Sequence, residues 1–170
     1  TWVTDQEYST DVVDSELTDL LDYLTVDTSA DSVVFSGANV YVQSGAGSTD
    51  STVNGVGNLI VGYDEDSGEL VSTKAGSHNL IVGPYHSYSS YGGVVFGYNN
   101  LVAGPNSSVT GGWYNWATGD QSSVAGGASN LASGERSSVT GGIHGEASAE
   151  VSSVTGGENL TAATYGSYAP

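Results

Sequence analysis

The fold is indicated by a short repeated sequence, Ser107-Ser108-Val109-Thr110-Gly111-Gly112, because close copies of it return at a constant interval. The copies begin 15 residues apart, at Ser122, Ser137 and Ser152. A period this short has room for two short strands and two turns, but not for a pair of helices. We therefore predict a solenoid of stacked coils, each rising about 4.8 Å, in which parallel strands bond from coil to coil and equivalent residues form columns.

Weaker copies of the repeat lie upstream. Apolar triplets followed by glycine begin at Leu59, Leu80 and Val94, and we take these residues as the equivalents of Val109. Alternating apolar residues such as Leu80 and Val82 are typical of strands. The predicted interior has one row of Val94, Val109, Val124, Val139 and Val154 and a second row of Ala117, Ala132 and Ala147.

The predicted interior is thin. Where the upstream coils carry Val82 and Phe96, the later coils carry glycine, and we expect the interior to narrow towards the C-terminus. A coil that encloses one Val and one Ala buries little apolar surface, which makes a single chain marginally stable. This predicts burial against other chains. The glycines concerned are Gly111, Gly126, Gly141 and Gly156.

The composition of the 170-residue chain excludes several classes of function. Lys and Arg number 2 against 19 Asp and Glu, a formal net charge of −17, which leaves no basic groove for nucleic acid and no attraction to an anionic membrane. Without cysteine there are no disulfides or thiolate metal sites. No apolar stretch approaches the roughly 20 residues of a membrane span. The acid excess fits a halophilic host or its virus, and equally an ordinary extracellular protein.

The N-terminal segment differs from the repeats. Residues 1–31 carry acidic side chains and no basic one, and Leu17, Leu20 and Leu24 follow helical spacing. We predict a short helix at about 14–25 that forms the end of a coiled coil. The expected organisation is an acidic segment at 1–31, a β-roll at 32–165 and a tail at 166–170. Because residue 1 is Thr and Met is absent, we expect a processed chain or part of a longer one.

The Ser-Val-Thr-Gly-Gly units, followed by Asn-x-Ala-Ser-Gly as in Asn130–Gly134, resemble the head repeats of trimeric autotransporter adhesins, the YadA-like heads, and related repeats of phage and viral tail fibres. The resemblance covers about residues 33–165. It implies an all-β, left-handed parallel β-roll, three chains side by side and neighbouring coiled coils. In those heads a large aliphatic residue usually stands where this chain has Gly111, Gly126 and Gly141, so packing inside or between the rolls should differ.

Aromatic residues gather in the middle coils and are the candidate ligand-binding residues. Aromatic faces on a rigid rod can stack on sugars, but they can equally fill the interface between chains, where such residues are enriched. The sequence favours the interface over a glycan platform. By the 15-residue register Tyr98 and Trp113 share a column. The candidates are Tyr85, Tyr98, Trp113, Tyr114 and Trp116.

An acidic insertion follows the first clear strand. Asp64, Asp66 and Glu69 surround a glycine and are candidate ligands for Ca²⁺, which takes six to eight oxygens. A solvated acidic loop without metal is the favoured alternative.

The sequence predicts no catalytic residues. A tailspike-like enzyme would use a pair of carboxylates, but Glu135, Glu146 and Glu158 occupy different columns of the repeat. Ice or mineral binding would need an unbroken threonine ladder, and Ala125 interrupts the one formed by Thr110, Thr140 and Thr155. We expect a non-enzymatic homotrimeric fibre domain, an adhesin head, filament subunit or tail-fibre segment, that lies outside the cell or on a virion and contacts a host surface or glycan. The alternative is a glycan-active enzyme on a β-solenoid.

Overall fold

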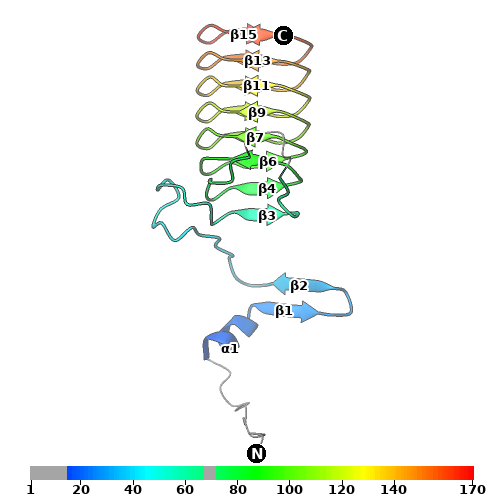
Figure 1. Cartoon of the computed structure of the whole chain (residues 1–170). Coiled ribbons are helices and arrows are strands. Elements are labelled where there is room, and N and C mark those ends of the chain that lie inside the picture. Colours follow the sequence, from blue (N-terminus) through cyan, green and yellow to red (C-terminus); the bar gives the residue numbers. More distant parts are fainter. Residues whose placement is uncertain (1–14, 67–71) are drawn as a thin grey trace, which may run out of the picture. The chain divides into compact units, whose positions relative to one another are not determined.

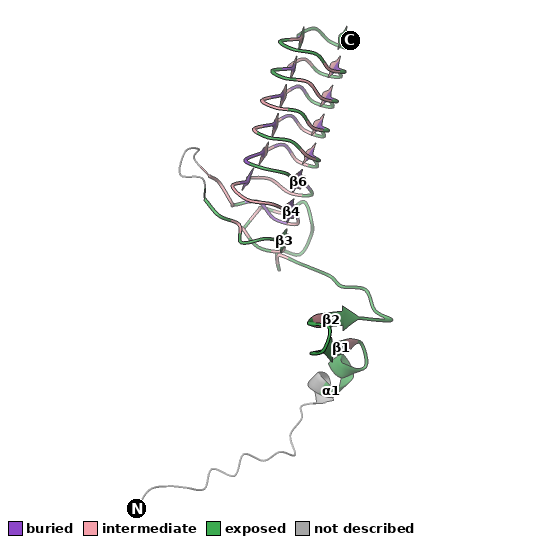
Figure 2. Ribbon diagram, turned by 90° about the vertical axis from the view of Figure 1, so that its right-hand side faces the viewer, coloured by how far each residue is buried: buried purple, intermediate pink, exposed green. Residues whose placement is uncertain are grey.

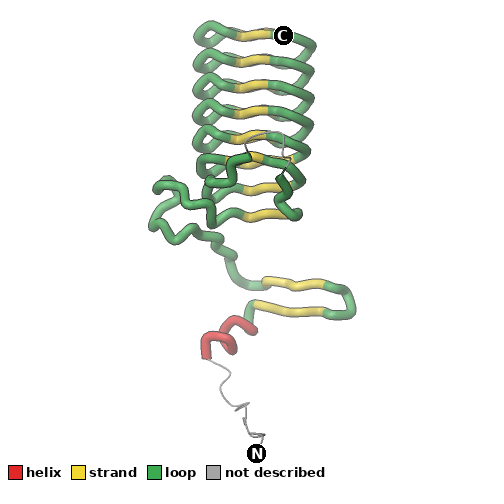
Figure 3. The backbone as a smooth tube through the Cα atoms, in the orientation of Figure 1, coloured by secondary structure: helices red, strands yellow, loops and turns green. Residues whose placement is uncertain are grey.

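The computed structural model describes residues 15–66 and 72–170 (Figure 1). These residues fall into two units, which divide between Tyr41 and Val42. The second unit contains two parallel sheets that stack coil upon coil (Figure 3). Within the described residues the protein is nearly all-β with one short helix, so the predicted parallel β-solenoid is confirmed.

The larger sheet of the solenoid has eight strands within the described residues, each paired in parallel with the next coil. In spatial order they are β3 (Leu59–Val61), β4 (Leu80–Val82), β6 (Val94–Phe96), β8 (Ser108–Val109), β10 (Ser123–Val124), β12 (Ser138–Val139), β14 (Ser153–Val154) and β16 (Tyr168–Ala169).

The smaller sheet has six strands within the same part of the chain, and its residues keep one register from coil to coil. They are β5 (Ser87–Tyr88), β7 (Leu101–Val102), β9 (Trp116–Ala117), β11 (Leu131–Ala132), β13 (Glu146–Ala147) and β15 (Thr161–Ala162).

The core lies between the two sheets and consists of two columns of buried residues. Figure 2 colours the buried residues purple along the coils. The alanine row predicted from the sequence is confirmed, with Val102 and Ala162 at its ends and Tyr88 one coil further upstream. The column from the larger sheet is Ile81, Val95, Val109, Val124, Val139 and Val154, each at most 1% exposed.

The predicted register of the upstream coils is wrong by one residue. Val94 pairs with Ser108, and it is Val95 that pairs with Val109. The coils ending at Val95 and Val109 are one residue shorter than the later ones, so the 15-residue interval from Val94 leads to the wrong neighbour. In the three-residue strands the middle side chain faces inwards, because successive side chains alternate between the faces of a sheet.

The predicted narrowing of the interior is also wrong. Val82 and Phe96 pair with each other on the outer face, and the shifted register aligns Phe96 with the exposed Thr110. The glycines that seemed to replace them have no role in the interior. A Cβ atom added to Gly126 or Gly141 would meet nothing within 4 Å.

The first unit contains a hairpin that the sequence did not predict. Helix α1 (Ser15–Leu21) ends well before residue 25, and Leu24 begins β1 (Leu24–Asp27), which pairs antiparallel with β2 (Ser32–Phe35). The Asp27 carboxylate closes the turn by accepting hydrogen bonds from the backbone N–H and hydroxyl of Ser29. Leu24 therefore does not extend a helical row from Leu20. Residue 14, where the helix was expected to begin, and the side chain of Leu17 lie outside the described residues.

The domain limits also differ from those predicted. Ser32, the predicted start of the roll, belongs to the hairpin, whereas the solenoid continues beyond residue 165. Within the predicted tail at 166–170, Tyr168 and Ala169 form β16 and pair with Ser153 and Val154.

A ladder of buried asparagines joins the coils at one turn. The Oδ1 atom of Asn115 accepts the backbone N–H of Asn130 at 3.0 Å, and that of Asn100 accepts the N–H of Asn115 at 2.7 Å. The Asn115 Nδ2 group donates to the carbonyl groups of Gly111 and Gly127 at 3.1 and 3.0 Å. Each asparagine thus satisfies turn groups of its own coil and of the next, which water would otherwise have to reach.

The paired glycines of the repeat should respond differently to alanine. Gly127 has a φ of +84°, and an added Cβ would lie 2.2 Å from the carbonyl oxygen of Gly142. Gly127→Ala should therefore lower the free energy of unfolding by about 2–5 kcal/mol. Its neighbour Gly126 is not in the left-handed region, and Gly126→Ala should change it by less than about 0.5 kcal/mol. Urea unfolding of both variants checks this, and equal effects would contradict the described turn.

Candidate functional site

The five predicted ligand-binding aromatics form two neighbouring groups. Tyr85 and Tyr98 meet edge to face with ring centroids 5.2 Å apart. Tyr114 lies between the other two, 5.6 Å from Trp113 and 5.8 Å from Trp116. A parallel bridge joins Tyr98 to Trp113, which confirms their predicted shared column. Tyr85 and Tyr98 belong to the turns of two successive coils, and the second group belongs to the coil that follows.

The backbone of the turns determines where these rings point. Tyr85 and Tyr114 adopt positive φ values of 66° and 59°, the left-handed conformation that non-glycine residues rarely adopt. Tyr98 and Trp113 occupy the bridge column and are half exposed, at 47% and 51%. Trp116 lies in strand β9, in a column with Leu101 and Leu131. Each coil thus offers three surface positions here: the bridge column, the residue with positive φ and the first strand residue. In the coil of residues 113–116 all three carry aromatic side chains.

A cleft of about 410 Å³ opens beside the second aromatic group, across three successive coils. Tyr114 and Trp116 form one part of its wall, and the corresponding residues of the next two coils form the rest. The buried indole N–H of Trp116 has no hydrogen-bond partner within the described protein. The further lining residues are Ser129, Asn130, Leu131, His144, Gly145 and Glu146.

The sequence did not single out the downstream half of this cleft as a binding site. Ser129 and His144 stand 15 and 30 residues after Tyr114, and Leu131 and Glu146 stand at the same intervals after Trp116. The repeat register was therefore the signal that could have found them, because residues of one column lie side by side on the surface. The aromatic candidates alone indicate residues 84–116 and do not extend further downstream.

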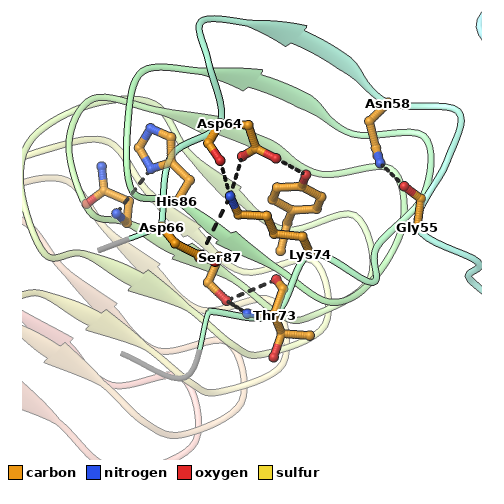
Figure 4. A network of polar contacts seen from close by, with 10 residues as sticks. Gly55, Asn58, Asp64, Asp66, Thr73, Lys74, His86 and Ser87 are labelled. Carbon is orange, nitrogen blue, oxygen red and sulfur yellow. Dashed lines mark hydrogen bonds and ion pairs between the residues drawn. The ribbon is translucent and has the colours of Figure 1, made fainter. Parts of the chain in front are cut away.

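One of the two basic residues of the chain forms ion pairs with the acidic insertion. Lys74 Nζ lies 3.3 Å from Asp64 Oδ1 and 3.8 Å from Asp66 Oδ1, and donates to the Asp64 carbonyl group (Figure 4). The other carboxylate oxygen of Asp64 accepts the Tyr88 hydroxyl at 2.8 Å. Burial is the main reason why the pKa of the Tyr88 phenol is raised, and this hydrogen bond raises the pKa further. The insertion is thus fastened to the core.

Two of the three predicted Ca²⁺ ligands belong to this ion-pair network. An ammonium group stands between Asp64 and Asp66, and Glu69 lies outside the described residues. Residues 15–66 and 72–170 contain no group of three acidic, His or Cys side chains placed to hold a metal. The Ca²⁺ site remains a prediction from sequence.

The segment after the insertion covers the open edge of the smaller sheet. Thr73 accepts the backbone N–H of Tyr88 at 2.7 Å and exchanges hydrogen bonds with the Ser87 hydroxyl at 3.0 and 3.1 Å. An uncovered edge strand invites pairing with other chains. Strand β5 is protected from this.

A second cleft, of about 350 Å³, lies in the loop before the first coil. His78 contributes to it, but both ring nitrogens are engaged. Nε2 accepts the backbone N–H of Ser44 at 3.0 Å, and Nδ1 lies 3.2 Å from the carbonyl oxygen of Thr49. His78 therefore holds the loop in place. The other lining residues are Gln43, Gly45, Gly47 and Ser48.

The three carboxylates considered for catalysis are separated. Glu135 binds Arg136 at 3.2 Å, and Glu158 belongs to the bridge column of Ile143. Glu146 alone lines the aromatic cleft. Hydrolysis of a glycosidic bond generally requires two carboxyl groups on either side of that bond.

The chain was compared with known proteins. It matches no family model, no curated protein and no solved structure. Among the described residues, no helix combines the length and apolar character needed to cross a bilayer.

His86 begins the polar ladder in place of asparagine. Its Nδ1 accepts the backbone N–H of Asn100 at 3.1 Å, and its Nε2 donates to the carbonyl group of Val82 at 3.1 Å. The ring is fully buried, and this burial lowers its pKa in the folded protein. His86 is therefore neutral in the solenoid over a pH range in which the unfolded chain takes up a proton.

The stability contributed by neutral His86 should be lost as the pH falls below about 6.5, the pKa of an unfolded histidine. The loss ends at the lower pKa of the folded state. His86→Asn, which copies Asn100, Asn115 and Asn130, should remove this component while keeping a donor and an acceptor. Unfolding midpoints measured at a series of pH values check it. Exposed His144→Asn is the control, and a pH dependence unaltered by His86→Asn would contradict the assignment.

Proposed function

We propose that the chain is a non-enzymatic domain of a homotrimeric surface fibre, which presents a rigid β-roll outside the cell or on a virion and attaches it to a host surface. The observation that carries this proposal is a solenoid whose outward-facing side chains differ in character from coil to coil. Residues on most coils are small and polar, whereas a few coils expose apolar and aromatic side chains. The resemblance to YadA-like heads and tail fibres supports the trimer and a left-handed roll.

An apolar patch on the outer face of the larger sheet supports association between chains. Two outward columns run across β3, β4 and β6, and Leu59 and Val61 are 52% and 56% exposed. Further along the sheet these columns continue with serine and threonine or alanine. The core buries only two columns of side chains, so burying this patch against other chains adds stability. The patch consists of Leu59, Val61, Leu80, Val82, Val94 and Phe96.

The aromatic groups support a role in attachment. Half-exposed Tyr98 and Trp113 stand on a turn of a rigid scaffold, and their column becomes Ala128 and Ile143 on the next coils. Binding residues commonly lie on turns that a rigid framework positions. The single carboxylate of the cleft favours binding over hydrolysis.

Sedimentation of the whole chain at micromolar concentration should give a trimer. Phe96→Thr, which copies Thr110, should raise the trimer dissociation constant at least tenfold because it removes an apolar side chain from the patch. Thr140→Ala, which copies Ala125, is the matched control and should leave it unchanged. A stably folded monomer of the unaltered chain would overturn the proposed assembly.

Attachment is tested separately with the same chain on host cells. Trp113→Ala and Tyr98→Ala, which copy Ala128 of the same column, should reduce cell binding at least fivefold while the variants remain trimeric. Loss of the trimer in these variants would make the residues structural. If the unaltered trimer binds no surface, the domain is a spacer, and the adhesive part of the proposal is wrong.

A further inference from the structure

We propose that the cleft beside Tyr114 and Trp116 is a binding site for an uncharged saccharide. This inference rests on the proposed attachment function and assigns it a ligand class and a location. It adds to the proposed contact at Tyr98 and Trp113 a ligand site on the three coils that contain residues 114–116, 129–131 and 144–146.

The aromatic wall of the cleft suits a sugar ring. The ring centroids of Tyr114 and Trp116 lie 5.8 Å apart with an interplanar angle of 35°, and both residues line the cleft. Leu131 extends this wall onto the next coil, because it is paired with Trp116. A pyranose ring has an apolar face of C–H groups that can lie against such a surface. Small-molecule sites typically combine apolar and aromatic walls with a few polar groups.

The other end of the cleft supplies the polar groups that sugar hydroxyls need. The Glu146 carboxylate accepts hydrogen bonds, the His144 ring has one donor and one acceptor when neutral, and the Ser129 hydroxyl can do both. The Trp116 indole N–H lacks an acceptor within the described protein. That nitrogen has no exposed surface, so the polar contacts to a ligand come from Ser129, His144 and Glu146.

The electrostatics of the cleft exclude anionic ligands. No Lys or Arg lines it, Glu146 contributes negative charge, and the chain as a whole carries −17. A phosphate or an acidic sugar would be repelled. A quaternary ammonium group is recognised by a cage of rings around the cation. This cleft is lined by two such rings, Tyr114 and Trp116, which are too few to surround a cation, and this favours an uncharged ring.

The scaffold holds the cleft in its binding geometry. Its residues come from consecutive coils joined by parallel backbone pairs, and the buried Asn115 and Asn130 fasten the adjacent turn. A site that is ordered before binding loses less conformational entropy when the ligand arrives. Three coils offer room along the solenoid axis for more than one sugar unit, so an oligosaccharide should bind more tightly than a monosaccharide.

The columns of the solenoid provide the variants for a test. Trp116→Leu copies Leu101 and Leu131, and Tyr114→Ser copies Ser129, so both changes suit the fold. Glu146→Gln removes only the charge. Tyr168→Ser, which copies Ser153, controls for loss of an exposed aromatic ring. Glu158→Gln controls for loss of a carboxylate outside the cleft.

The whole chain is applied to an array of neutral, sialylated and choline-bearing oligosaccharides, and affinities for the strongest neutral ligand are then measured by calorimetry. Trp116→Leu should weaken binding at least tenfold and Glu146→Gln three- to tenfold, with both controls within twofold. Unfolding midpoints of all variants accompany the measurements. If Trp116→Leu is unfolded, the test is the saccharide affinity of Glu146→Gln compared with that of Glu158→Gln.

The proposal is overturned if no neutral saccharide binds, if sialylated or choline-bearing probes bind better, or if the cleft variants equal their controls. Cell attachment measured with Trp116→Leu separates this from the broader function. Attachment that persists without neutral saccharide binding removes the cleft assignment and leaves the attachment function standing. A chain that binds saccharides but no cells loses the attachment function while the cleft assignment remains.

Discussion

Backbone pairing between successive coils is the constraint on which the structure depends. Each strand has only two or three residues, and its N–H and C=O groups bond to the coils on either side. Because these bonds hold successive coils at one constant spacing, the backbone of the turns has little conformational freedom. It requires glycine where the next coil approaches Gly112 and Gly127 within 2.2 Å of an added Cβ, and it requires a side chain such as Asn115 to satisfy the turn groups. The sequence repeats because the geometry of pairing repeats.

The same constraint separates structural from functional positions. Inward columns hold nearly constant residues, such as the valines of the larger sheet and the alanines of the smaller one. Several outward columns differ from coil to coil, and these columns contain the apolar patch, the aromatic groups and the cleft. The Trp116 column passes from Leu101 through Trp116 and Leu131 to Glu146 without any change in backbone register. Surface chemistry therefore changes from coil to coil on an unchanged framework.

Much of this fold could be predicted from the sequence, because a 15-residue period admits few architectures. The alanine column and the Tyr98–Trp113 neighbours follow directly from that period. The upstream register could not be obtained the same way. A coil shortened by one residue leaves Val94 at the repeat interval from Val109, and only the inward-facing position of Val95 resolves it. The hairpin after α1 was missed because Leu24 continues a helical spacing of leucines into a strand.

Only part of the candidate site could be predicted, because the rest depends on the register between coils. Aromatic residues draw attention by type, which identified Tyr114 and Trp116. Ser129, His144 and Glu146 are ordinary residues that become a site only when columns are superposed. His86 was similarly obscure. Its role as a buried member of the asparagine ladder depends on hydrogen bonds to Val82 and Asn100 that no local pattern reveals.

The insertion between Val61 and Leu80 shows how this architecture can change over evolutionary time. The two strands remain in register although the connecting segment is longer than any other between neighbouring coils, and the Tyr88 hydroxyl joins Asp64 of the extra loop to the core. A turn of this roll thus accepts additional sequence without moving the coils on either side. Tandem duplication or loss of one complete coil in the gene would preserve every column as well. Length and surface features can therefore diversify independently, by recombination within the repeats and by loop acquisition at their turns.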